Sequence, residues 1–420
     1  MPSPQTLLPW LLGGAIGAAG IFQGLHWRSL GNADQVAGLE NQLRIAGEEN
    51  AMLARENESL RSLAQGGGEL AVPQEFIDAM EKETGLRFSS SPVLHRAGSE
   101  ELHDRIAAAV ESRFGPSGLD DRQEAYRLIG WLRPEDDLLA GLTAVRSAGL
   151  RGWFDETTGE GWVTERFDLK NIPDQAEIVR LLTHILFHQN FPQEADYPGD
   201  DAVRAREALL AGAAAAAEAR FYSQQALASG FLPMTENNAA EQLLATQPGF
   251  LQGLASFPAL QGKALAETLR VQGEEKFLSA LRRPPLTTRA VFYPAEPVAE
   301  PQALELPAPP EEPFLTESAG QLGLQLWLDA LGDVGAASEI AASWKNDRYI
   351  LFPDGEESSA VLWDIEMETA AAADQLEASA REIAIAMARP SRQLTISRIS
   401  PTRIRFINTH DGVTAEKLKN

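Results

Sequence analysis

Residues 178–192 read IVRLLTHILFHQNFP, and the interpretation of the whole chain depends on this stretch. It has the pattern of a helix and carries two of the chain's six histidines, His184 and His188, four residues apart. Imidazoles at i and i+4 share one helix face and can chelate a zinc ion. The stretch is therefore a metalloprotease helix, a damaged copy of one, or a helix that carries two histidines for another reason.

The composition indicates a folded, acidic protein. The chain has 420 residues, room for one large domain or two ordinary ones, and its 44% hydrophobic and 23% charged residues are typical of globular proteins. The formal net charge of −24 would repel a phosphate backbone, so we expect no nucleic acid as a partner. The absence of cysteine excludes disulfides, thiol catalysis and cysteine-ligated zinc.

The first 65 residues have the pattern of a membrane anchor followed by a stalk. Residues 7–27 contain no Asp, Glu, Lys or Arg and are just long enough to span a bilayer, which predicts a transmembrane anchor within residues 1–30. Residues 31–65 have a strict seven-residue apolar repeat and predict a coiled coil, with a single amphipathic helix as the alternative. Asparagine at a with leucine at d favours a parallel dimer through residues 36–64.

From residue 69 onward the pattern is mainly helical with a few strands. The body, residues 69–293, is expected to contain an alanine-rich helix and, at residues 151–165, a β-hairpin in RGWFDETTGEGWVTE. A proline- and glutamate-rich connection at 294–313 is expected to be extended. Residues 314–420 have strand and helix patterns that predict a small antiparallel sheet in the same body. The expected fold class is α+β and mainly helical.

Six stretches of the body form an ordered pattern. IGWLRPEDDLLAGL, LRGWFDETTGEGWV, RRPPLTTRAVFYP and SWKNDRYILF join the quoted helix and the alanine-rich DAVRAREALLAGAAA. Together they resemble a family of bacterial zinc metallopeptidases of the gluzincin type, whose members carry a helix HExxHALQDQxFD and a second helix DxxxAxxALxEGxA. The resemblance runs from about Ala71 to Ala380 and implies a zincin-like body with small antiparallel sheet elements, following the transmembrane helix and coiled-coil stalk.

The same resemblance implies a zinc site that has lost most of its working groups. Aligned without gaps, His184 falls on the second zinc histidine, Arg180 on the first, and Leu181 on the catalytic glutamate. In the second helix, Ala211 falls on the glutamate that is the third zinc ligand. A register with His184 and His188 as the two ligands requires a deletion of three residues and restores neither the base nor the third ligand.

The chemistry of these residues agrees with a lost site. Zinc hydrolysis needs three protein ligands, an open position for water and a carboxylate that accepts the water's proton. Arginine is permanently charged, cannot ligate a metal and repels a dication. We therefore expect no catalytic residue, no metal and no cofactor. We expect Arg180 either to turn into the vacated space and be paired, or to turn out to solvent. Packing or hydrogen bonding is the simplest role of the two histidines, and Arg180, His184 and His188 are the candidates for ligand binding in the old cleft.

These features predict a membrane-anchored, dimeric, catalytically inactive metallopeptidase-like protein, a pseudopeptidase that binds an unknown protein or peptide or acts as a scaffold. The predicted location is a bacterial inner membrane, crossed once, with the body exported or periplasmic. Two alternatives stay open: an active hydrolase whose site is not recognisable in the sequence, and a purely structural spacer.

Overall fold

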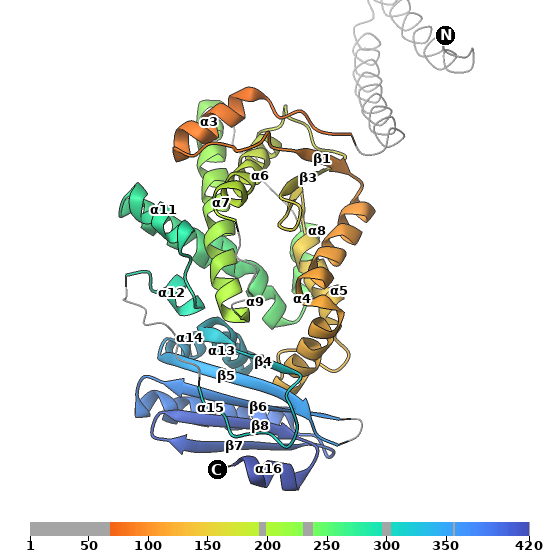
Figure 1. Cartoon of the computed structure of the whole chain (residues 1–420), viewed down its shortest axis with the longest axis vertical. Helices are drawn as coiled ribbons and strands as arrows, with labels where there is room; N and C mark the ends of the chain where they lie inside the picture. The colour runs from red at the N-terminus through yellow and green to blue at the C-terminus, as the bar shows by residue number, and fades with distance from the viewer. Residues whose placement is uncertain (1–67, 193–198, 230–237, 296–303, 356–357, 420) are drawn as a thin grey trace, which may run out of the picture. The chain divides into compact units, whose positions relative to one another are not determined.

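The computed structural model describes residues 68–192, 199–229, 238–295, 304–355 and 358–419 (Figure 1). Residues 69–420 form one compact unit, and the description below concerns the described part of that unit. Its architecture is α+β and mostly helical, with one three-stranded and one five-stranded sheet.

Helices make up most of the unit up to residue 295, and α6 and α7 lie side by side within it (Figure 1). They are α3 Gln74–Thr84, α4 Ser99–Ile129, α5 Leu138–Ser147, α6 Ile172–Asn190, α7 Asp200–Ser229, α8 Asn238–Ala245, α9 Gly249–Phe257, the π-helical turn η1 Pro258–Gly262, α10 Lys263–Val271, α11 Glu274–Arg282 and α12 Thr288–Phe292.

The smaller sheet packs against α6. Its strands are β1 Leu94–Ala97, β2 Gly152–Asp155 and β3 Glu160–Thr164, in the order β1-β3-β2. β2 and β3 are antiparallel and form the predicted hairpin, which is confirmed. β1 pairs with β3 in parallel, which the sequence did not indicate. Residues of this sheet and of α6 share one apolar cluster that includes Leu94, Val163, Leu181 and Ile185.

The larger sheet lies in the C-terminal part and has the strand order β4-β5-β6-β8-β7, with every neighbouring pair antiparallel. The predicted antiparallel sheet is therefore present. Its strands are β4 Leu315–Glu317, β5 Trp344–Pro353, β6 Ser359–Met367, β7 Gln393–Ser400 and β8 Arg403–Thr409. The accompanying helices are α13 Gly320–Leu328, the 3-10 turn η2 Asp329–Leu331, α14 Val334–Ala341, α15 Ala370–Met387 and α16 Gly412–Leu418.

The two faces of this sheet bury different sets of side chains, as strand alternation requires. On β6, Val361 and Trp363 join the largest core, which also holds residues of α4, α13 and α15, whereas Leu362 lies in a separate cluster with Leu418 of α16. The indole of Trp327 on α13 donates to the Ile129 carbonyl at the end of α4 (2.8 Å). The helical part and the sheet thus share a core.

The proline- and glutamate-rich connection, predicted to be an extended surface segment, is in contact with the sheet at its described end. Leu304 is 8% exposed, and its carbonyl accepts a hydrogen bond from Arg348 on β5 (3.2 Å). The next carbonyl, of Glu305, accepts one from Arg403 on β8 (2.5 Å). Arginine side chains can reach out of a sheet and hold an extended chain through its carbonyls.

The predicted transmembrane helix, and with it the single-pass inner-membrane location, is wrong on the present findings. In the described part of the chain no helix is both long and apolar enough to cross a membrane. The two longest, α4 with 31 residues and α7 with 30, carry charged residues along their length. Residues 7–27 and 36–64, to which the anchor and the dimeric coiled coil were assigned, lie outside the described residues, and the described ones give no support to either.

Candidate functional site

Helices α6 and α7 run antiparallel and in contact. Pro173 lies in the first turn of α6, where its missing N–H would have no partner. Midway along α6, Arg180 lies 3.9 Å (Nε to Oε2) from Glu218 of α7. After the C-terminal end of α6, the carbonyl of Phe191 accepts a hydrogen bond from Arg206 of α7 (3.3 Å). Close approach of α7 to its neighbours is possible because its buried face is mostly alanine: Ala205, Ala208, Ala213, Ala214, Ala216 and Ala217.

A different side of α7 touches the π-helical turn η1, backbone against backbone. A Cβ atom on Gly212 would lie 2.0 Å from the carbonyl carbon of Gly262. A Cβ atom on Gly262 would lie 2.0 Å from the carbonyl oxygen of Ala208. Only glycine permits these distances, so the two glycines allow α7 and η1 to pack backbone against backbone.

One face of each helix keeps partial access to solvent. Between residues 176 and 187 of α6, every residue is buried except Arg180 and His184, and His188 continues the same line one turn later. Glu207, Ala211 and Glu218 form a comparable half-buried line on α7, at spacings of four and seven. We call these six residues the α6–α7 strip. It contains three of the four positions that the resemblance assigns to the zinc site.

The guanidinium of Arg180 is held from three sides. Its Nη2 donates to the Gly152 carbonyl on β2 (2.6 Å), and its Nε donates to Glu177 Oε2 one turn earlier (3.1 Å). A second contact joins Nη2 to the other oxygen of Glu177. Oε2 of Glu218 lies 3.9 Å from the same Nε. Of the two positions expected for Arg180, the structure has the paired one, and its partners Glu177 and Glu218 are acids that the alignment did not single out.

The pKa shifts show which acid is the main partner. Burial acts to lower the pKa of Arg180, but the charge and hydrogen bonds of Glu177 outweigh it, so this pKa is raised. Burial, with repulsion from Glu177, raises the pKa of Glu218 to about 7, against the opposing effect of Arg180. Glu177 is therefore the principal counter-ion, and Glu218 is a more distant partner that exchanges its proton near neutral pH.

The two histidines pack against the hairpin. The ring of His184 stacks on Phe154 of β2, with centroids 5.1 Å apart, and His188 meets the same ring edge-on at 5.7 Å. Burial, followed by the charge of Arg180, lowers the pKa of His184 to about 3. Burial and Arg206 likewise lower the pKa of His188. Both imidazoles are therefore favoured in the neutral form, and their packing is the simple role that the sequence suggested.

The residues present do not fit a catalytic zinc ion. Leu181 is fully buried against Gly152 and Gly161 of the sheet, and Ala211 offers no ligand. Across the described ranges no group of three His, Cys, Asp or Glu side chains is placed to hold a metal ion. Arg180 carries a fixed positive charge where a first ligand would be needed, and a dication beside it would be repelled.

Three other stretches that carry the resemblance, those with Trp131, Thr288 and Asp347, meet near the beginning of α7, away from the strip. Asp201 accepts hydrogen bonds from the backbone and hydroxyl of Thr288 (3.1 and 2.7 Å). Asp347 of β5 accepts from the indoles of Trp344 and Trp363 (3.0 and 2.8 Å) and from the backbone at the start of α13. Trp131 donates to the Gly323 carbonyl of α13 (3.2 Å). These segments hold the framework in place and supply no catalytic group to the strip.

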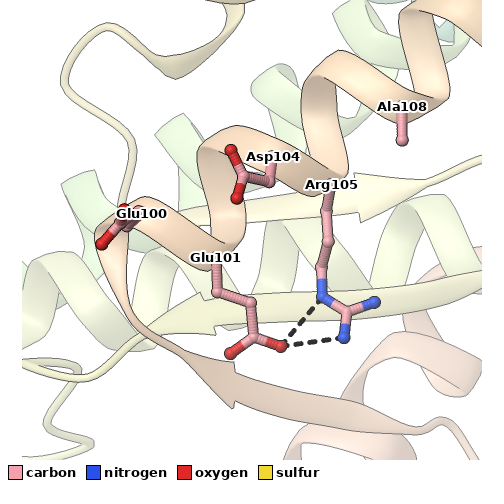
Figure 2. A pocket seen from close by; sticks show the side chains of 5 residues that line it. All are labelled: Glu100, Glu101, Asp104, Arg105 and Ala108. Carbon is pink, nitrogen blue, oxygen red and sulfur yellow. Dashed lines mark hydrogen bonds and ion pairs between the residues drawn. The ribbon is translucent and has the colours of Figure 1, made fainter.

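A surface depression lies on the outer side of α4, and it is unrelated to the strip. Figure 2 shows its lining, which is Glu100, Glu101, Asp104, Arg105 and Ala108, with Arg105 Nη2 bonded to Glu101 (2.8 Å). It is open and its residues are exposed or half-exposed. A row of acids on one helix turn is an ordinary solvated face.

Comparison with known proteins gives one match. Residues 311–414, from the end of the proline-rich connection into α16, are similar to a family described as "Domain of unknown function (DUF8575)". No curated protein and no solved structure matches the chain. The resemblance to gluzincin metallopeptidases therefore stays a prediction from the sequence.

Proposed function

We propose that this chain is a catalytically inactive, metallopeptidase-like protein, a pseudopeptidase, that binds a protein or peptide at the α6–α7 strip. The observation that carries the proposal is the guanidinium of Arg180, fixed by Gly152, Glu177 and Glu218. It puts a permanent positive charge where the resemblance puts a zinc ligand. Such a group can bind a carbonyl or carboxylate, but it cannot lower the pKa of a water molecule as zinc does.

Binding is favoured over a purely structural role because the strip keeps charges in contact with solvent. A helix pair that serves only as a spacer is most stable when its facing side chains are apolar, because each half-buried charge carries a desolvation cost. Between residues 176 and 187 of α6 only Arg180 and His184 are not buried, and the strip as a whole holds two acids, a cation and two imidazoles. A few polar groups on a mostly apolar surface can fix the orientation of a ligand.

One observation favours an active hydrolase as the second candidate. Glu177 and Glu218 both approach Nε of Arg180, at 3.1 and 3.9 Å, and the pKa of Glu218 is raised to about 7. A carboxyl group that titrates near neutral pH can act as a general acid or base. Arg180 is already the partner of both carboxylates, however, so it competes with a substrate for them.

The proposal is tested on the purified full chain with two measurements. Zinc content is determined by elemental mass spectrometry after equilibration with zinc and removal of the excess, and casein hydrolysis is followed with and without a chelator. We expect no stoichiometric zinc and no hydrolysis. Hydrolysis lost with the chelator and in His184→Ala would refute the proposal, whereas chelator-resistant hydrolysis lost in Glu218→Gln would establish the second candidate.

A further inference from the structure

A short segment of the proline-rich connection, residues 304–310, lies on one face of the larger sheet (Figure 1). We call it the cover segment. It belongs to no helix or strand, and in the described part of the chain none of its backbone groups is bonded to another backbone group. Leu304 is buried, Glu305 is exposed and Leu306 is half-buried. This alternation is that of an extended chain that lies along a surface.

The surface beneath the cover segment has an apolar part and a polar part. Leu306 packs against the apolar part, which is formed by Ile350, Phe352, Ala360, Leu362, Ile407 and Leu418. In the polar part, Arg348 of β5 donates to the carbonyl of Leu304 (3.2 Å), and Arg403 of β8 donates to that of Glu305 (2.5 Å). We call this surface the docking face. Hydrogen bonds to main-chain carbonyls accept any sequence, so the apolar part determines which side chains fit.

Release of the cover segment would break no ion pair. In the described part of the chain its hydrogen bonds are the two from Arg348 and Arg403, and both acceptors are neutral carbonyls. Arg403 keeps a second partner, the buried carboxylate of Asp364. Arg348 is half-buried, so water can replace the Leu304 carbonyl as its partner. A segment with so few hydrogen bonds belongs to the least stable parts of a fold.

The sheet does not need the cover segment for its strand pairing. Pairing at this edge begins after the segment, where the N–H of Phe314 donates to the carbonyl of Leu351 (2.8 Å) and β4 pairs with β5. The similarity to the domain family covers residues 311–414, which include β5, β6 and β8 but not the cover segment. The docking face and the segment that covers it are therefore separate parts of the chain.

We propose that the docking face binds an extended segment of another protein, and that the cover segment is an intramolecular competitor for the same place. The partner segment has apolar side chains two positions apart, because Leu304 and Leu306 are the side chains that pack on the face. A second copy of this chain is a less favourable occupant. It offers an identical segment, and a segment attached to its own face has the higher effective concentration. The proposal does not depend on the α6–α7 strip.

The test is fluorescence anisotropy on the full chain with the peptide Leu-Glu-Leu-Pro-Ala-Pro-Pro, the sequence of residues 304–310, labelled through two added glycines. In Leu304→Ser/Leu306→Ser the chain's own segment should leave the docking face, because its packed side chains are no longer apolar. We expect the peptide to bind this variant at least ~10-fold more tightly than the natural chain, which keeps its competitor. A control peptide with serine at both leucine positions should bind at least ~10-fold more weakly than the leucine peptide.

Two arginine variants, each added to Leu304→Ser/Leu306→Ser, locate the site. Arg348→Gln should weaken peptide binding ~10-fold, because a charge-assisted hydrogen bond to the peptide backbone is lost. Arg381→Gln should leave binding unchanged, since Arg381 is 56% exposed on α15, whose buried residues pack on the other face of the sheet. Urea denaturation checks that each variant is folded. If the serine pair does not fold, Leu304→Ala/Leu306→Ala takes its place.

The inference is overturned if the peptide does not bind the variant without leucines, if it binds the natural chain equally well, if the serine peptide binds as tightly, or if the two arginine variants have the same effect. It is also overturned if the natural chain sediments as a dimer and Leu304→Ser/Leu306→Ser as a monomer, because the segments would then be exchanged between two copies. None of these results bears on zinc content or casein hydrolysis, so the pseudopeptidase proposal is decided separately.

Discussion

Replacing Arg180 by leucine is the most informative single change to the strip, because two acids depend on its charge. The substitution removes the hydrogen bond to the Gly152 carbonyl and both contacts to Glu177, whose side chain is only 6% exposed. Removing one partner of a fully buried ion pair costs roughly 3–5 kcal/mol. Arg180 is 24% exposed, and leucine recovers some apolar packing, so we expect a loss of ~3 kcal/mol in the free energy of unfolding at pH 8.

The stability cost of Arg180→Leu should depend on pH, because the carboxyl group of Glu218 titrates near neutral pH. Without the guanidinium, the folded-state pKa of Glu218, which is already raised to about 7, should rise further. A carboxyl group with a raised folded-state pKa stabilises the protein at low pH and loses that contribution as the pH rises through the raised value. The cost of Arg180→Leu should therefore be smaller at pH 5 than at pH 8. In the double variant Arg180→Leu/Glu177→Gln, much of the cost should disappear, because the uncompensated charge is gone.

Urea denaturation of the full chain, followed by tryptophan fluorescence at pH 5, 6.5 and 8, measures these differences from the midpoint and slope of the transition. Arg133→Gln, which removes an equally charged but exposed side chain, is the matched control. A cost below ~1 kcal/mol for Arg180→Leu, or one that does not change with pH, would mean that Arg180 is an ordinary surface arginine. Such a result would exclude Arg180 as the group that compensates the charges of Glu177 and Glu218.

Three further predictions concern the surroundings of the strip. Burial raises the pKa of Asp201 to about 7, so its contribution to stability is lost as the pH rises toward 8. The loss of unfolding free energy caused by Asp201→Asn, measured by urea denaturation, should therefore be smaller at pH 8 than at pH 5. Gly212→Ala should destabilise by ~3 kcal/mol or prevent folding, because its Cβ would lie 2.0 Å from the Gly262 carbonyl carbon. Gly249→Ala, whose Cβ meets no neighbouring atom within 4 Å and whose backbone has no positive φ, is the matched control. His184, with a pKa lowered to about 3, should keep its neutral imidazole NMR shift from pH 8 to pH 5, and its contribution to stability should be lost as the pH falls below about 6.5.

Patterns local to the chain predicted the elements well. The alternation in RGWFDETTGEGWVTE indicated the hairpin, and the runs after residue 343 indicated β5 to β8, because a two-residue period specifies a strand without knowledge of its partners. The parallel pairing of β1 with β3 was missed, since β1 is four residues long and its partner lies more than sixty residues away. Length and apolar content also predicted a membrane helix, which no described helix supports.

The sequence named positions of the candidate site but not the contacts between them. An alignment compares positions one at a time, so the resemblance could mark Arg180, Leu181 and Ala211 only singly. It gave no reason to choose Glu218 as a partner of Arg180, because that contact depends on the relative position of α6 and α7. Glu177 was detectable in principle, since an acid three residues before an arginine on one helix is a known pairing distance. Arg113, Arg146 and Glu207 come from three separate helices, and only the fold brings them together.

The proposed function implies that α6 and α7 once formed a zinc site in which Arg180 has replaced a ligand. It is tested by the zinc content of the full chain, measured by elemental mass spectrometry for the natural sequence and for Arg180→His/Ala211→Glu. The double variant restores the two missing ligands beside His184 and leaves the buried Leu181 intact. We predict no stoichiometric zinc in the natural sequence and about one zinc ion per chain in the variant. Stoichiometric zinc in the natural sequence, or no zinc in a folded variant, would show that Arg180 has not replaced a zinc ligand.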